Sequence, residues 1–228
     1  MPTLVNNEKN HPKKTKTPWP TKAAMEQIYK LNLWGGKETE FYSGEGSHHP
    51  AIVEPYIAAV KTFLDSFKEP ITVCDLGCGD FNVGKQLVSH TAKYIAVDIV
   101  PSLIIRNKEI FKAANLEFRC LDIAKAQLPK ADCAIVRQVL QHLSNAEIKS
   151  IVNNLANFNY IILTEHLPNG AFEPNKDIIS GQANRLKVQS GVNLQASPFN
   201  LKIKKETQLS TVVLNNEKEV IKTTILQL

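Results

Sequence analysis

The 228-residue sequence has no hydrophobic run long enough to cross a bilayer, and it begins without the apolar segment that directs secretion. It also has no CxxC pair. All four of its cysteines lie in or beside expected strands, where a thiol packs as a small apolar side chain. We therefore expect reduced cysteines, no metal site built from them, and a cytoplasmic protein without a membrane part.

Most of the chain has little excess of positive over negative charge. The formal net charge is +5, but residues 1–22 hold five lysines against one glutamate, so the rest of the chain carries about +1. Such a balance argues against a nucleic-acid surface. Residues 1–20 are rich in lysine and proline and have little to bury, so they are expected to form a disordered basic tail.

Residues 21–228 have the length of one large domain, whose first part, residues 21–67, is expected to be helical with a long loop. Thr21 suits the start of a helix, and apolar residues at helical spacing between Val53 and Phe67 predict a second one. Pro55 marks its first turn or a kink. Between the helices, the segment Trp34–His49 combines four glycines with aromatic residues and histidines. This composition suits a loop that covers a ligand, and equally a surface loop pinned by aromatic anchors.

Residues 71–84, ITVCDLGCGDFNVG, organise the rest of the chain. The apolar run at their start predicts a buried strand that ends at Asp75. Gly77 and Gly79 predict a tight turn, and apolar residues at helical spacing from Val83 predict a helix after it. A strand, a glycine turn and a helix N-terminus predict a nucleotide-type site with free backbone N–H groups at its mouth.

The βα alternation continues after this turn. A second strand, residues 94–97, ends in Asp98, nineteen residues past Gly79, where an acid would meet ribose hydroxyls. Leu103, Ile110 and Ala114 indicate one face of the next helix. A third strand, residues 116–120, precedes an acid and an isoleucine that could contact an adenine amino group and its ring, although a simple turn acid explains Asp122 as well.

Two further strands carry polar residues at their carboxyl ends. Residues 131–136 lead into Arg137 and Gln138, and residues 160–163 lead into Glu165 and His166. Ser144 and Glu147 predict a capping box before the intervening helix. After a polar stretch over residues 167–198, residues 201–205 and 220–228 predict an antiparallel pair. The fold class is therefore α/β: a doubly wound, mostly parallel sheet of seven strands with helices on both faces.

The motif D-L-G-C-G-D resembles the first motif of class I S-adenosylmethionine-dependent methyltransferases, and residues 71–166 follow the order of that family. The strings WGG, SGEGS, CGDFN, VDIVPSLI and NLQASPFNL resemble a narrower group of small bacterial methyltransferases, most of them uncharacterised. That group usually has a proline where this chain has Ser197 and often a tryptophan where it has Val83. Neither difference falls on a position assigned to the cofactor.

The resemblance implies a Rossmann-like fold, S-adenosylmethionine as cofactor, and no metal. The residues that it and the strand ends assign to the cofactor are Trp34, Asp75, Gly77, Cys78, Gly79, Asp98, Ile99, Asp122, Ile123, Arg137 and Gln138. The candidate catalytic bases are His142, His166 and Glu165, and a structural role is an open alternative for each.

The predicted reaction is in-line methyl transfer to a small-molecule hydroxyl, carboxyl or amine. The sequence VRQVL stands where enzymes that methylate nucleic-acid amines carry [N/D]-P-P-[Y/F], so a nucleic-acid acceptor is not expected. Two other classes stay open: a catalytically silent cofactor-binding or partner-binding domain, and a nicotinamide-dependent oxidoreductase, which Asn82 at the third glycine position disfavours. The oligomeric state has no signature in the sequence.

The acceptor is expected at the ends of the fourth and fifth strands. Its predicted roof consists of the segment Trp34–His49 and the long loop through residues 193–199. Closure of such a roof would exclude water from the reacting groups.

Overall fold

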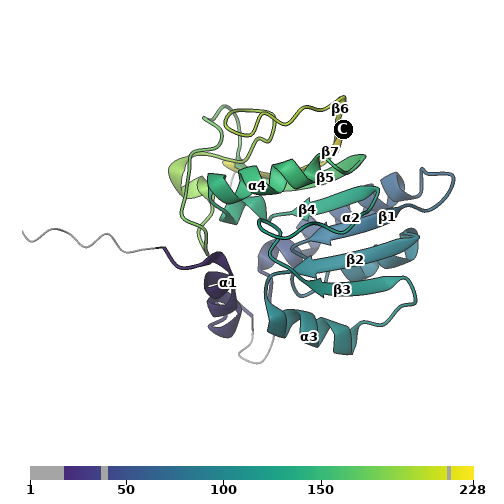
Figure 1. Cartoon of the computed structure of the whole chain (residues 1–228). Helices are drawn as coiled ribbons and strands as arrows, with labels where there is room; N and C mark the ends of the chain where they lie inside the picture. The colour runs from purple at the N-terminus through teal and green to yellow at the C-terminus, as the bar shows by residue number, and fades with distance from the viewer. Residues whose placement is uncertain (1–17, 37–40, 215–216) are drawn as a thin grey trace, which may run out of the picture.

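A single seven-stranded sheet, in the order β3-β2-β1-β4-β5-β7-β6, forms the centre of the computed structural model (Figure 1). The structure describes residues 18–36, 41–214 and 217–228, so most of the expected basic tail lies outside the described residues. Strands β1 to β5 are parallel, whereas β7 runs antiparallel to both β5 and β6. This is the predicted fold class, with its antiparallel C-terminal pair.

The first five strands lie close to their predicted positions, and the sixth does not. The observed strands are β1 (Thr72–Leu76), β2 (Lys93–Asp98), β3 (Leu116–Cys120), β4 (Cys133–Arg137), β5 (Tyr160–Pro168), β6 (Lys205–Leu214) and β7 (Glu219–Gln227). The prediction of a strand over residues 201–205 is wrong, because Leu201 packs into the core from an irregular segment. Strand β6 is the edge strand and has no fully buried side chain, so its hydrophobic pattern is weak.

Helices cover both faces of the sheet. They are α1 (Thr21–Lys30), α2 (Pro50–Leu64), α3 (Pro101–Ile110) and α4 (Asn145–Leu155). In Figure 1, α4 lies in front of the sheet and α2 behind it. Side chains alternate along each strand, so Val73 packs with the α2 cluster and Cys74 with the α4 cluster. Pro55 lies inside α2, and Ala114, predicted to belong to α3, falls beyond its end.

The predicted helix after the glycine turn is wrong. Residues 77–93 contain two short 3₁₀ turns instead, Gly84–Gln86 and Val88–His90. Phe81 adopts a left-handed backbone conformation, and its fully buried ring packs edge-on against Tyr94 and Phe118. The buried ring anchors the chain to the sheet before a regular helix can begin, and β2 starts soon afterwards.

The long loop between β5 and β6 is ordered by buried polar residues. Arg185, which is 1% exposed, donates to the backbone carbonyls of Leu140 and Leu143. Asn175 donates to the carbonyls of Asn193 and Ser197. These bonds take the place of strand or helix pairing and hold the loop against the end of the sheet. Among the described helices, none is long and apolar enough to cross a membrane.

Candidate functional site

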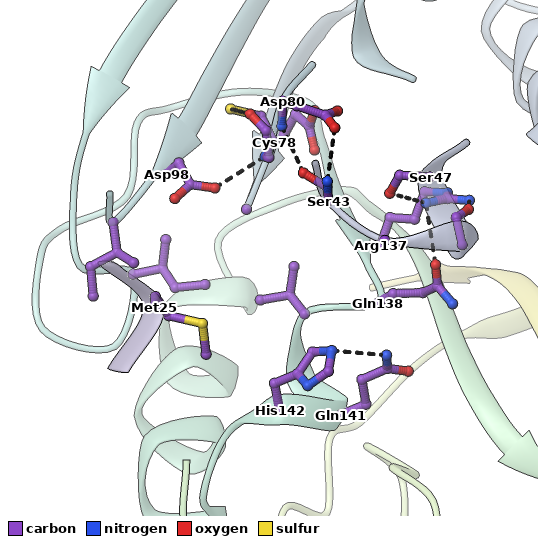
Figure 2. A pocket seen from close by; sticks show the side chains of 18 of the residues that line it. Met25, Ser43, Ser47, Cys78, Asp80, Asp98, Arg137, Gln138, Gln141 and His142 are labelled. Atoms are coloured by element: carbon purple, nitrogen blue, oxygen red, sulfur yellow. Dashed lines mark hydrogen bonds between the residues drawn. The ribbon is translucent and has the colours of Figure 1, made fainter. Parts of the chain in front are cut away.

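A cavity of about 330 Å³ opens where β1, β2 and β4 end. Figure 2 shows Asp98, Cys78 and Asp80 on one side of it and His142 and Gln141 on the opposite side. Arg137 and Gln138 lie between these two sides, at the end of β4. The cavity therefore joins the glycine turn to the polar residues that follow the fourth strand, as expected for this edge of an α/β sheet.

The glycine turn has no free N–H groups to offer a ligand. Gly77 and Cys78 both donate to the carbonyl of Val97, at 2.8 and 2.9 Å, and Gly79 donates to the Asp98 carboxylate at 3.0 Å. Asp80 N–H donates to Ser43 Oγ. The expectation of free donors is wrong, because the neighbouring strand β2 and the segment before α2 accept these bonds. A phosphate-binding turn needs free backbone N–H groups, and here these groups already donate to acceptors within the protein.

The two glycines are required by the shape of the turn. Both have positive φ, +86° at Gly77 and +57° at Gly79. A Cβ on Gly77 would collide with the side chain of Val139, and one on Gly79 would meet Ser43 Oγ. The turn therefore depends on glycine both for its backbone conformation and for its close packing.

Carboxyl groups dominate the charged lining. Burial raises the pKa of Asp75 to about 7, and it also raises the pKa of Asp98. Among the described residues that line the cavity, five carry a carboxyl group (Asp75, Asp80, Asp98, Asp122 and Glu147) and a single one, Arg137, carries a guanidinium. The site is thus suited to a ligand with positive charge.

Arg137 is buried, and it donates most of its hydrogen bonds to the segment Phe41–His49, which we call the covering segment. It donates to Ser47 Oγ at 3.2 Å and to the carbonyl of Gly46, and its guanidinium lies over the Tyr56 ring. Its Nε and the Tyr56 hydroxyl are buried without a partner among the described residues. Both side chains line the cavity, and these two polar atoms lack the hydrogen bond that buried polar groups normally make.

The covering segment is attached to the glycine turn through Asp80. The Asp80 carboxylate accepts from the Ser43 N–H at 2.9 Å and lies 2.6 Å from His48 Nε2. Asn82 donates to the carbonyl of Ser47. Ser43 and Ser47 both line the cavity, so these bonds bring the segment over the site that the sequence predicts it to cover.

His142 faces the cavity from the side opposite the glycine turn. Its Nδ1 lies 3.2 Å from the carbonyl of Ala183 and must donate to it, which leaves Nε2 as the acceptor. Gln141 donates to this Nε2 at 3.1 Å, while its own Oε1 accepts from the N–H of His166. Burial lowers the pKa of His142 to about 4, so its imidazole is neutral at pH 7.

The other two candidate bases are placed differently. His166 lines the cavity, but its Nε2 lies 2.9 Å from the Glu219 carboxylate, and burial lowers its pKa. Glu165 points away from the cavity, lines a separate pocket between the sheet and the long loop, and has its pKa raised to about 8 by burial. The expectation that Glu165 gathers with His142 at the acceptor side is therefore wrong, because successive side chains of β5 face opposite sides of the sheet.

All the residues predicted to bind the cofactor line the one cavity, together with His142 and His166. This is a finding of position, and the roles given to them stay predictions. The long loop contributes Gln182 and Asn184, not residues 193–199, so that part of the predicted roof is wrong. Sequence reasoning also missed Tyr29, Tyr56 and Asp80. Asp80 follows the glycines directly and could have been found, whereas the tyrosines look like core residues of amphipathic helices.

The sequence is also similar to known proteins. Residues 73–158 match a family described as a methyltransferase domain. A malonyl-[acyl-carrier protein] O-methyltransferase of Acetivibrio thermocellus is 35% identical over 121 residues. That match covers 50% of this chain and 42% of the relative, so the chain spans less than half the length of that relative.

Solved structures of low identity share the fold over nearly the whole chain. An N-methyltransferase from Bradyrhizobium japonicum, in complex with S-adenosylhomocysteine, has a TM-score of 0.62 at 12% identity, over 90% of this chain and 98% of its own. A magnesium protoporphyrin IX methyltransferase from Synechocystis, with bound S-adenosylmethionine, has a TM-score of 0.55 at 17% identity, over 94% and 100% of the two chains.

Proposed function

We infer that the chain is a class I S-adenosylmethionine-dependent methyltransferase, which transfers the methyl group of this cofactor to a hydroxyl or amine of a small molecule. The observation that carries the proposal is the chemistry of the glycine turn. Its N–H groups are used within the protein, while carboxylates line the space beside it. A dinucleotide brings a pyrophosphate that needs donors, whereas S-adenosylmethionine brings an ammonium and a sulfonium against a single carboxylate, a net positive charge that negative groups stabilise.

The cofactor residues divide by the groups that they suit. Each Asp98 oxygen accepts one backbone N–H, from Gly79 or from Val100, and keeps lone pairs for two ribose hydroxyls. Asp122 suits an adenine amino group, with Ile99 and Ile123 beside the ring. The cofactor supplies an electrophilic methyl group when it is bound, so the protein needs to orient the acceptor and exclude water.

The acceptor belongs on the side of His142 and Gln141, away from the glycine turn. Arg137 is the one lysine or arginine among the described lining residues, and the covering segment already accepts two of its hydrogen bonds. An acceptor with a free carboxylate would lack a countercharge there. This charge pattern favours a hydroxyl or an amine over a carboxyl group.

His142 is the residue proposed to meet the acceptor. Its Nε2 lone pair can accept the acceptor's O–H or N–H in place of the Gln141 amide, and this fixes the direction of the nucleophile. Proton transfer to a positioned base contributes about 10²- to 10⁴-fold in favourable cases. Burial disfavours the charged imidazolium, so His142 acts mainly by orientation when the acceptor is a neutral amine.

Calorimetric titration tests the cofactor. We expect saturable binding of S-adenosylhomocysteine and no comparable binding of NAD or NADP. Tight nicotinamide binding would overturn the proposal.

Turnover is then tested by following S-adenosylhomocysteine release with matched hydroxyl, amine and carboxyl acceptors. Malonyl-[acyl-carrier protein], the acceptor in the name of the Acetivibrio relative, serves as a carboxyl representative. Faster release with a carboxyl acceptor would contradict the preference argued from charge. Binding without turnover on any acceptor would instead identify a silent cofactor-binding domain.

A further inference from the structure

A second cavity, of about 310 Å³, lies between the antiparallel end of the sheet and the long loop. Its floor comes from β5, β6 and β7, and its walls come from residues 168–172 and 192–195. It shares no lining residue with the cavity at the glycine turn. Neighbouring residues of β5 line different cavities, His166 the first and Glu165 the second.

Glu165 is the unusual group in this second cavity. Its side chain is 2% exposed, and neither carboxylate oxygen accepts a hydrogen bond of normal geometry from the described residues. Arg185 and the backbone amide of Gln141 favour its ionised form from nearby. Arg185, however, donates its hydrogen bonds to backbone carbonyls and to Asn145, and it makes no hydrogen bond to Glu165. A buried acid that lacks a well-formed hydrogen bond is costly and calls for an explanation.

The other charged groups in this cavity are already paired. Lys222 lies directly opposite Glu165 in the β5–β7 ladder, yet its ammonium is 3.6 Å from the Glu206 carboxylate. Glu206 also accepts a hydrogen bond from Gln195 at 2.6 Å. Glu165 therefore has no ion-pair partner among the described charged residues that line this cavity. It is also less exposed to solvent than Lys222 and Glu206.

The remaining lining is mostly hydrocarbon. It consists of Leu163, Leu167, Pro168, Phe172, Val192, Leu194, Val220 and Leu226, with Asn193 and Thr224 as neutral polar groups. Such a surface binds an apolar body, and Glu165 adds two acceptor oxygens, with a negative charge when a cation displaces its proton.

We propose that this cavity is a second binding site, for a small organic ammonium ion with an aliphatic body. The ammonium N–H groups would donate to the two free oxygens of Glu165, and the hydrocarbon would pack against the leucines of the floor and the loop. An ammonium suits the site better than an alcohol, because a hydrogen bond between a charged donor and a carboxylate is about twice as strong as one between neutral groups.

Hexylammonium chloride is the probe that tests this site, with 1-hexanol as the uncharged counterpart of the same length. Methyl NMR on the full chain reports both cavities at once, since Leu194 and Leu226 line the second and Met25 lines the first. We expect saturable shifts of the two leucines with hexylammonium and at least tenfold weaker binding of hexanol. Shifts confined to Met25, equal binding of hexanol, or no saturable shift would each overturn the proposal.

Two variants sharpen the test. Glu165→Gln removes the charge with little change of shape and should weaken hexylammonium binding at least tenfold. Glu173→Gln alters an exposed glutamate of the same loop that does not line the cavity, and it should bind the probe as the wild type does. Unchanged binding to Glu165→Gln would overturn the proposal.

A calorimetric readout covers the case in which Glu165→Gln fails to fold. Burial raises the pKa of Glu165 to about 8, so hexylammonium binding at pH 7 should displace a proton from the wild-type protein, seen as a dependence of the binding heat on the buffer. Binding that releases no proton at pH 7 and also keeps its affinity at pH 4, where a carboxyl group is protonated, would overturn the proposal.

Discussion

Asp98 has two roles, one in the structure of the glycine turn and one proposed in binding the cofactor. Its oxygens accept the N–H groups of Gly79 and Val100, so the acid holds the turn as well as facing the cavity. Sequence reasoning assigned it to the ligand alone, because hydrogen bonds to backbone N–H groups leave no mark in a residue pattern. Loss of a partner by a buried N–H costs about 1–3 kcal/mol.

Asp98→Asn should therefore weaken S-adenosylhomocysteine binding tenfold or more and also lower the thermal midpoint of the free protein. Calorimetry and thermal unfolding measure the two effects. Asp65→Asn, an exposed acid paired with His90, serves as the control and should leave the affinity unchanged. Wild-type affinity in Asp98→Asn would remove the acid from the cofactor site.

His142 can be examined by an isosteric change in the acceptor region. His142→Gln keeps a polar group of similar length but removes the imidazole lone pair that Gln141 faces. We expect turnover to fall about 10²-fold or more, with cofactor affinity changed less than threefold. The comparison variant is His90→Gln, on the surface beside Asp65, which should keep wild-type turnover. An equal loss of cofactor binding and turnover would mean that His142 supports the cavity and does not contact the acceptor.

Among the elements, the start of α4 was predictable in detail. Ser144 and Glu147 form the expected capping box, in which the Ser144 side chain accepts from the Glu147 N–H. Glu147 is also bonded by Thr21 and Ser180, which come from α1 and the long loop. These tertiary bonds could not be predicted, since nothing local in the sequence indicates which distant hydroxyls will meet an acid.

The β6 and glycine-turn predictions failed for different physical reasons. Strand β6 is an exposed edge, so burial does not impose alternation on it. After the turn, the spacing of Val83, Leu87 and Val88 does correspond to buried or half-buried positions. Two 3₁₀ turns bury the same residues as one helix would, and the deciding contact, the buried ring of Phe81, is tertiary. That the predicted site residues would line one cavity was easier to predict, because most of them lie at strand ends that a parallel sheet brings to one edge.

Ser144→Ala should lower the free energy of unfolding by about 1 kcal/mol, in line with the loss of an N-cap. Urea unfolding followed by circular dichroism measures this. Ser66→Ala, which removes an exposed hydroxyl bonded to the Phe63 carbonyl, should cost less. An equal cost for the two variants would mean that the box contributes little beyond an ordinary surface bond.

The covering segment is held by Ser43 on both sides. Ser43 Oγ accepts the Asp80 N–H at 2.8 Å and lies 2.9 Å from the Tyr29 hydroxyl. Ser43→Ala removes both bonds, so a broad-specificity protease should cut within residues 41–49 several-fold faster than in the wild type. Bound S-adenosylhomocysteine should slow cutting of the wild-type segment. Equal cutting rates with and without ligand would contradict its role as a cover.

Across the whole molecule, buried ionisable groups on different elements make stability depend on pH in opposite senses. Burial raises the pKa of Asp75 to about 7 and of Glu165 to about 8, and it lowers the pKa of His142 to about 4. The raised acids bind more protons in the folded state than in the unfolded one. Their contribution is complete below about pH 3.8, the ordinary pKa of Asp75, and is lost as the pH rises through 7 and 8. The lowered pKa of His142 has the opposite effect and reduces the free energy of unfolding at low pH. This effect operates only below pH 6.5, where His142 is protonated in the unfolded chain but stays neutral in the folded one.

Between pH 6.5 and 8 the His142 effect is therefore absent, and the free energy of unfolding should fall as the pH rises. Each raised acid contributes a slope of up to about 1.4 kcal/mol per pH unit. Glu165→Gln removes one of these acids and leaves Asp75 and Asp98, so the wild type should lose about 1–2 kcal/mol more than this variant over that interval. Urea titrations at fixed pH values measure the difference, and the exposed Glu173→Gln should keep the wild-type slope. A Glu165→Gln profile parallel to that of the wild type would mean that Glu165 is already ionised in the folded protein, with a partner that compensates its burial.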